Sequence, residues 1–177
     1  MYTSENYPYT FSTFSSFSPC ALTLSIPGLT KMHNLTSVTP RPVRFRAWLW
    51  NGTEYTLLLN TFQVLNKSTN YKLRLENFNG NASSAGIDQE ACIDNFNRNT
   101  NQEFSTYDRD NDANGADHCS QDFGGAGYWY KSCTSISPNV EYCPTSSCGS
   151  NVKNIKVKCL KGDSYSMKRF QIDVLVM

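Results

Sequence analysis

A run of alternating acidic residues is the feature of this chain with the clearest chemistry. Residues 108–117 read DRDNDANGAD, which places carboxylates on alternate positions of a loop rich in Gly and Asn. Carboxylate and carbonyl oxygens that converge on one point bind hard cations, and calcium prefers such ligands. The run therefore indicates a calcium site, with a solvated acidic turn that holds no metal as the alternative.

The loop does not follow the EF-hand pattern. Counting from Asp108, position six is Ala113, where the sharp turn needs a glycine. Position twelve is Cys119, where a bidentate glutamate belongs. Another arrangement of ligands is therefore expected.

Catalytic chemistry is not indicated. The chain has two histidines, His33 and His118, and no nucleophile, histidine and acid follow one another in a recognisable order. Two neighbouring carboxylates can perform acid–base hydrolysis, but the close spacing of Asp110 and Asp112 suits a metal better. We expect no enzyme.

Length and charge narrow the classes of function. A chain of 177 residues is long enough for one domain with its own core. Its net charge of +1, with 18% charged residues, excludes electrostatic capture of nucleic acid or an anionic membrane as a default function. No apolar run approaches the roughly 18 residues that a membrane-spanning helix needs.

The cysteines favour an extracellular location. Seven cysteines without a zinc-type spacing indicate an oxidising compartment, against the alternative of buried free thiols in the cytosol. Four glycosylation sequons agree only weakly, because chance supplies about four at this content of Asn, Ser and Thr. Residues 1–20 lack the basic start and apolar stretch of a signal peptide, so we expect the chain to be a fragment.

The elements that position the acidic loop form an antiparallel sheet. Residues 43–50 alternate apolar and polar side chains, and the Asn51-Gly52 pair predicts a hairpin, since both residues tolerate the positive φ of a type I′ turn. Residues 55–64 and 71–75 complete a three-stranded meander. The apolar alternation from Phe170 predicts a final strand that lies centrally and is buried on both faces.

The rest of the chain shows less pattern. Residues 98–163 lack periodicity, and their cysteines and aromatic residues favour an ordered, functional region over disorder. Residues 1–42 form an atypical arm without assignment, in which the alternation at positions 7, 9 and 11 fits either a short strand or a mobile segment. We expect an α+β fold, mainly antiparallel β, with a sheet part (43–97 and 164–177) and a loop-rich part (98–163).

A series of motifs in fixed order resembles the fibrinogen C-terminal domain. Residues 104–112 read FSTYDRDND, and Cys119, a Gly-Gly pair at 124–125, the aromatic triplet at 128–130 and Cys133 follow. Residues 70–75 (NYKLRL), 78–82 (FNGNA) and 165–168 (YSMK), together with Tyr142, match the family in the same order. The likeness covers residues 43–177. The family's N-terminal subdomain has no counterpart in residues 1–42, so we expect one side of the sheet to be uncovered.

The resemblance implies a set of metal ligands. In the family one calcium is held by two carboxylates and two backbone carbonyls, which by position are those of Asp110, Asp112, Asn114 and Ala116. One extra residue lies between Asp112 and Cys119, and this bears most on the two carbonyls.

The family's disulfide falls on Cys119 and Cys133. Such a bridge stabilises by about 3 kcal/mol in the chain-entropy model. A bridge between Cys143 and Cys148 is geometrically allowed, although relatives do not show one. Cys20, Cys92 and Cys159 then remain, and an odd count leaves at least one thiol free or intermolecular.

The resemblance also implies a ligand pocket beside the calcium. By position its residues are Phe123, Tyr128, Ser132, Cys133 and Thr134, and the Ser132–Cys133 peptide is cis in relatives. For Tyr128 the alternative is plain core packing.

The ligands of relatives suggest two functions. The pocket takes acetylated sugars or amines in lectin-like relatives and a peptide end in fibrinogen. Thr134 stands where relatives commonly have His, and the segment after Tyr142 is shortened, which weakens a sugar-binding function. The resemblance thus implies a secreted, calcium-stabilised recognition module for an acetylated glycan or an extracellular protein. The alternative is an adhesive or structural domain in which calcium only orders the loops; oligomerisation would depend on sequence not present here.

Overall fold

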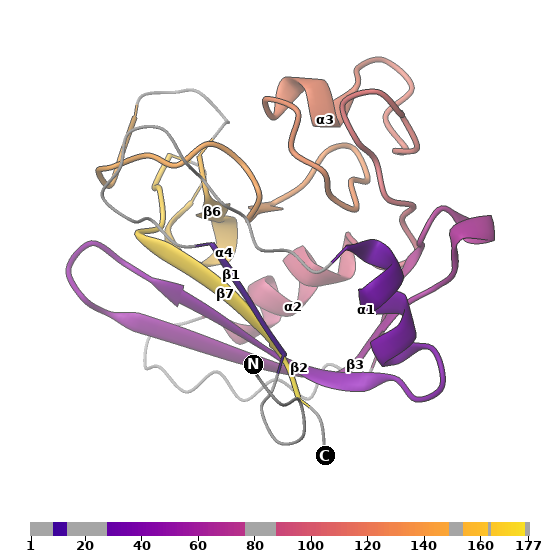
Figure 1. The fold of residues 1–177 in the computed structure, drawn as a ribbon. Helices are drawn as coiled ribbons and strands as arrows, with labels where there is room; N and C mark the ends of the chain where they lie inside the picture. The colour runs from indigo at the N-terminus through magenta and orange to yellow at the C-terminus, as the bar shows by residue number, and fades with distance from the viewer. Residues whose placement is uncertain (1–8, 14–27, 77–87, 149–153, 163, 176–177) are drawn as a thin grey trace, which may run out of the picture.

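A five-stranded antiparallel sheet is the frame of the molecule (Figure 1). The computed structural model describes residues 9–13, 28–76, 88–148, 154–162 and 164–175. In spatial order the strands are β1 (Tyr9–Thr13), β7 (Arg169–Val174), β2 (Arg41–Trp48), β3 (Glu54–Val64) and β4 (Leu73–Glu76).

Short helices and one small ribbon complete the described structure. The helices are α1 (Leu29–Thr36), the 3₁₀ turn η1 (Lys67–Thr69), α2 (Gln89–Asn97), α3 (Cys119–Asp122) and α4 (Lys158–Lys161). The ribbon pairs β5 (Ile136–Ser137) with β6 (Lys156–Val157). The predicted α+β fold, mainly antiparallel β, is confirmed.

The predicted hairpin joins β2 and β3, but its turn differs from the expected type. Only Gly52 has a positive φ, of 88°, whereas a type I′ turn needs positive φ at Asn51 as well. The Leu49 N–H donates to the Thr53 carbonyl (2.9 Å), so the loop is longer than two residues and includes Trp50. A three-residue loop that ends on a glycine in this conformation is the next most common hairpin connection.

The last strand occupies the central position that the sequence predicts. β7 pairs with β2 on one side and with β1 on the other. Phe170 and Val174 are buried on the core face, and Gln171 and Asp173 are buried on the opposite face. The alternation near the start of the chain fitted either a short strand or a mobile segment. The structure contains a strand there, β1, over Tyr9–Thr13.

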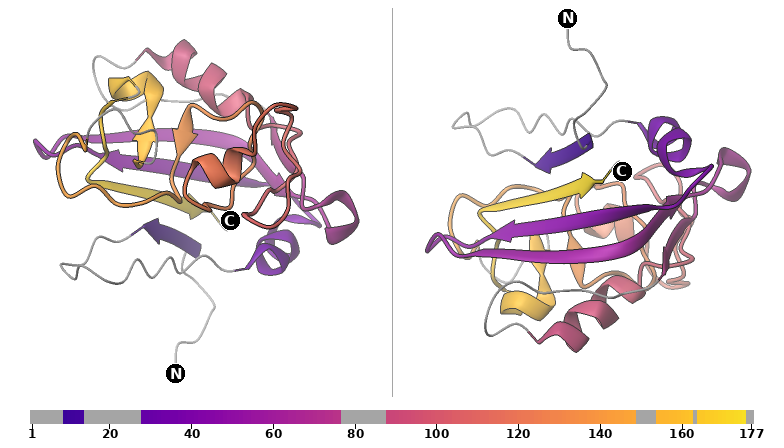
Figure 2. Two further views of the ribbon diagram at one scale, coloured as in Figure 1. Left: turned by 90° about the horizontal axis from the view of Figure 1, so that it is seen from above. Right: turned by 90° about the horizontal axis from the view of Figure 1, so that it is seen from below.

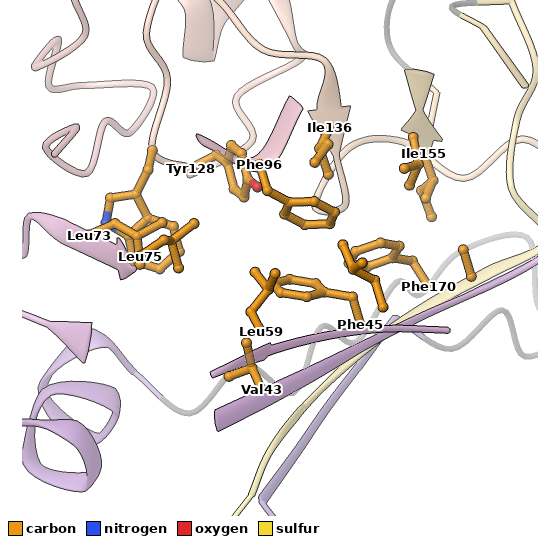
Figure 3. Close-up of a cluster of buried hydrophobic side chains, with 14 of the residues drawn as sticks. Val43, Phe45, Leu59, Leu73, Leu75, Phe96, Tyr128, Ile136, Ile155 and Phe170 are labelled. Carbon is orange, nitrogen blue, oxygen red and sulfur yellow. The ribbon is translucent and has the colours of Figure 1, made fainter. Parts of the chain in front are cut away.

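The core lies between the sheet and the layer of helices and loops above it (Figure 3). Every second residue of β2 points inward, so Val43, Phe45 and Ala47 are buried. Phe45 contacts Phe96 of α2, with ring centroids 4.3 Å apart. These contacts fix the helical and loop layer against one face of the sheet.

The opposite face of the sheet is polar. The right-hand view of Figure 2 shows β7, β2 and β3 in front of α2 and α4, with none of the described helices crossing them. Arg44 and Arg46 both pair with the buried Asp173, at 2.9 and 3.0 Å. Among the described residues, the face of the sheet that we expected to be uncovered therefore carries an ion-pair network.

The edge strand β4 anchors the loop-rich region. The Leu73 N–H donates to the Gln102 carbonyl and the Asn101 N–H donates to the Leu73 carbonyl, so residues that follow α2 cap this edge of the sheet. The indole N–H of Trp129 donates to the Tyr71 carbonyl (2.7 Å). The segment on each side of the acidic loop is thus tied to the same edge.

Candidate metal centre

Two pairs of backbone hydrogen bonds hold the start of the acidic loop. Ser105 and Tyr128 exchange two backbone hydrogen bonds of 3.0 and 3.1 Å, and Thr106 and Arg109 exchange two of 3.0 Å each. The Thr106 hydroxyl donates to Asp108, and this hydrogen bond lowers the pKa of the exposed Asp108 carboxyl. Asp108 is therefore occupied in closing the turn.

Three successive side chains then turn the backbone. The N–H of Asp112 donates to Asp110, that of Asn114 to Asp112 and that of Ala116 to Asn114, over 3.2, 2.8 and 3.4 Å. Each bond closes a turn of the kind that Asp and Asn form with the backbone two residues further on. The alternation visible in the sequence is therefore the cause of the curled loop.

Asp112 joins this loop to α3. Its second carboxylate oxygen accepts a hydrogen bond from the Cys119 N–H (2.9 Å) in the first turn of the helix. Burial is the main cause that raises the pKa of Asp112, and the neighbouring Asp110 charge also raises it. A divalent cation between the two carboxylates would offset this repulsion.

Asp110, Asp112 and His118 come together in space. One ligand atom from each lies within 4.8 Å of the other two. The Nδ1 atom of His118 is buried and has no hydrogen-bond partner among the described residues. The two carboxylates supply oxygen ligands of the kind that calcium takes, so the chemistry expected of the family is compatible with this loop.

The four ligands expected from the resemblance lie on one curl of chain. Asp110 and Asp112 converge, while Asn114 is half-buried and Ala116 is exposed on the turns that follow. The carbonyls of Asn114 and Ala116 stay a prediction. The proximity of His118 to the two carboxylates was not predicted from the sequence, where its place directly before Cys119 was the available signal.

A disulfide and a backbone hydrogen bond hold the loop from the other side. Cys119 and Cys133 are bridged, as the resemblance implies. The Ala113 N–H donates to the Lys131 carbonyl (2.8 Å), which places the tip of the acidic loop against the segment that contains the bridge.

The pocket residues divide into buried and accessible ones. Phe123 and Tyr128 are each 5% exposed and belong to the core, where Phe123 stacks on Tyr130 at 5.6 Å. Ser132 is exposed and Cys133 is half-buried. The Ser132–Cys133 peptide is trans, where the resemblance implies cis; a cis bond before a residue other than proline costs about 3 kcal/mol.

Thr134 is engaged in the fold. Its hydroxyl donates to the Ile136 carbonyl (2.9 Å) and accepts from the Asn99 side chain (3.1 Å). Where relatives commonly carry an imidazole, this chain therefore has a short side chain whose hydrogen bonds are already used.

The other cysteines form two further bridges, Cys143–Cys148 and Cys92–Cys159. The first was allowed by its spacing. The second joins α2 to α4 across 67 residues and was not predicted, because the sequence carries no sign of which helices pack together. Cys20 lies outside the described residues.

The fold and the loops define a class: a disulfide-bonded globular domain in which a sheet edge carries a curled acidic loop. The chain belongs to the fibrinogen C-terminal domain family. The profile described as "Fibrinogen beta and gamma chains, C-terminal globular domain" matches residues 15–175. The resemblance stated from the sequence is thereby confirmed.

Individual relatives agree with this assignment. The fibrinogen beta chain of Gallus gallus is 33% identical over 123 residues, which are 65% of this chain and 26% of that protein. Angiopoietin-related protein 7 of Homo sapiens is 30% identical over 136 residues, or 76% of this chain and 36% of that one. This chain therefore spans about a quarter to a third of the length of these relatives.

Solved structures share the fold. The fibrinogen-like globe domain of human ANGPTL2 superimposes with a TM-score of 0.72 at 25% identity, covering 84% of this chain and 63% of that one. Lamprey fibrin D-dimer, complexed with the peptide Gly-His-Arg-Pro-amide, gives 0.70 at 21% identity, covering 96% and 54%. No helix in the described part of the chain is long and apolar enough to cross a membrane.

Proposed function

We propose that this chain is a secreted recognition module whose loops are ordered by calcium. The observation that carries the proposal is the convergence of Asp110 and Asp112 on a loop that Asp112 fastens to the bridged Cys119. Asp110, Asp112 and the carbonyls of Asn114 and Ala116 are the proposed ligands. The bound ion supplies a positive charge that holds the carboxylates together; the backbone turns and the disulfide position them.

The recognition surface is proposed to lie beside the metal loop. Ser132 is its accessible residue, Cys133 and Thr134 flank it, and Phe123 and Tyr128 support it from the core. A surface held by a disulfide and a metal loses little conformational entropy when a ligand binds. The proposed ligand is an extracellular protein or an acetylated glycan.

One observation favours a second function. Phe123 and Tyr128 are core residues, and the Thr134 hydroxyl is already bonded within the fold. Few side chains of the proposed surface are therefore available to contact a small ligand. In this alternative the domain is adhesive or structural, and calcium only orders the loops.

A binding experiment separates the two functions. Ser132→Tyr places a large ring on the proposed surface, and Thr53→Tyr is the control at an exposed position of the β2–β3 hairpin. We expect the unchanged chain and the control to bind an array of acetylated glycans, or an extracellular protein partner, and to elute with chelator. Ser132→Tyr should lose this binding. Equal retention of all three chains would contradict a recognition surface at Ser132. Binding to proteins but to no glycan would exclude an acetylated glycan as the ligand.

A further inference from the structure

His118 stands at the end of the acidic loop, directly before α3. One of its ring nitrogens lies within 4.8 Å of a carboxylate oxygen of both Asp110 and Asp112. The backbone carbonyl of His118 accepts a hydrogen bond from the Asp122 N–H (3.0 Å), so the residue is fixed to the first turn of the helix. The imidazole is therefore held beside the two carboxylates by the backbone on each side of it.

One ring nitrogen of His118 lacks a hydrogen-bond partner where one is expected. Nδ1 of His118 is buried and no described residue contacts it with a donor or acceptor. Buried polar atoms are almost always satisfied, and an orphaned one calls for a water, an ion or a functional role. A metal ion held by the adjacent carboxylates is a partner that the surrounding residues can supply.

We propose that Asp110, Asp112 and His118 form a binding site for a transition divalent cation of the zinc class. This proposal rests on the proposed function in one respect, because both ions use Asp110 and Asp112. Calcium takes hard oxygen ligands, whereas imidazole nitrogen is a preferred ligand of zinc and its neighbours in the first transition row. Three side-chain ligands leave a fourth position of a tetrahedral zinc site for water or a ligand.

The two ions compete for one loop. Zinc requires the ring of His118, and calcium requires the oxygen atoms alone. Because both sets include the same two carboxylates, saturating zinc displaces calcium from the loop. The metal content of this domain would then depend on the ions available around it.

The chain offers a matched control for this site. It contains two histidines, and His33 lies on α1, where its Nδ1 contacts the Val64 carbonyl at 2.8 Å. Calorimetric titration with ZnCl₂ and CaCl₂ is performed on His118→Asn and His33→Asn. Both variants are made in a Cys20→Ser background, so that this cysteine cannot contribute a thiolate ligand for zinc.

We expect His118→Asn to weaken zinc binding by more than about tenfold, a loss that is typical even of an outer-sphere partner. His33→Asn should keep the zinc affinity of the parent, and both variants should keep its calcium affinity. As a readout that needs no variant, the imidazole nitrogen resonances of the parent chain should show zinc-dependent shifts at His118 alone.

Equal zinc affinity of His118→Asn and the parent, or zinc-dependent shifts at His33 alone, would overturn the proposal. If Asp110→Asn abolishes calcium binding while His118→Asn keeps the zinc affinity of the parent, the calcium function stands and the zinc site fails. If zinc binding needs Asp110 and His118 while calcium does not bind, the zinc site stands and the calcium function fails.

Discussion

At the scale of single residues, Asp112 has two roles in one carboxylate. One oxygen accepts from the Asn114 N–H at 2.8 Å and the other from the Cys119 N–H at 2.9 Å, so the side chain shapes the loop and fastens it to α3. Burial and the charge of Asp110 raise its pKa. The metal-free loop therefore carries a repulsion that its own hydrogen bonds only partly offset.

The buried tyrosines give a pH test of the core. Burial raises the pKa of the Tyr130 hydroxyl well above its usual value near 10. The neutral phenol is favoured in the fold, so stability is intact below pH 10. Above it the unfolded chain releases the proton first, and stability falls by up to about 1.4 kcal/mol per pH unit.

An alkaline titration followed by tyrosinate absorbance measures this difference. Tyr130→Phe should leave the tyrosinate signal gained before unfolding unchanged. A loss of signal in Tyr130→Phe below the unfolding transition would show that the ring is accessible in the folded state.

At the scale of elements, the disulfides close loops of very different length. They span 67, 14 and 5 residues, for Cys92–Cys159, Cys119–Cys133 and Cys143–Cys148 respectively. In the chain-entropy model a longer closed loop removes more freedom from the unfolded chain. The bridge between α2 and α4 should therefore contribute most to stability.

Replacing each pair by alanines tests this order. The expected losses in the free energy of unfolding are about 4, 3 and 2 kcal/mol from the longest loop to the shortest. Denaturant titration in excess calcium is the measurement. A larger loss for Cys143–Cys148 than for Cys92–Cys159 would mean that native-state contacts, rather than chain entropy, decide the effect.

The elements also show what local sequence can predict. In β2 every second residue is buried, and in β7 apolar and polar residues alternate although both faces are buried. Both strands were identified because these patterns are written in neighbouring residues. The turn type at Asn51-Gly52 was wrong, since Trp50 leaves the strand and donates from its indole to the Ser166 carbonyl at 3.1 Å, a contact across 116 positions. Such non-local contacts, including the pairing of β1 with β7, carry no signal in local periodicity.

The candidate site likewise contains residues whose positions local sequence predicts and residues whose positions it does not. The proximity of Asp110 and Asp112 was predictable because two-residue spacing on a turn-rich segment brings their oxygen atoms together locally. His118 joins them only because the loop folds back and Asp112 bonds to the start of α3. Phe123 and Tyr128 were expected near a pocket, and their burial became visible only with the packed core.

At the scale of the whole molecule, the sheet supports an irregular region that has few backbone ladders of its own. Residues 98–148 include only α3 and β5 among the regular elements described. Their order comes from the β4 edge, from two disulfides and from side chains that bond to the backbone. In this account a calcium ion is the remaining support of the recognition region.

Thermal unfolding with and without calcium, on the unchanged chain and on Asp110→Asn, tests this account most directly. Extracellular calcium modules bind at about 10⁻⁴ to 10⁻³ M, so several millimolar calcium should stabilise the chain by about 1.4 kcal/mol and raise the melting temperature by roughly 3–5 °C. The rise should be lost in Asp110→Asn. An equal response of the two chains to calcium, or none in either, would contradict a calcium site in the acidic loop.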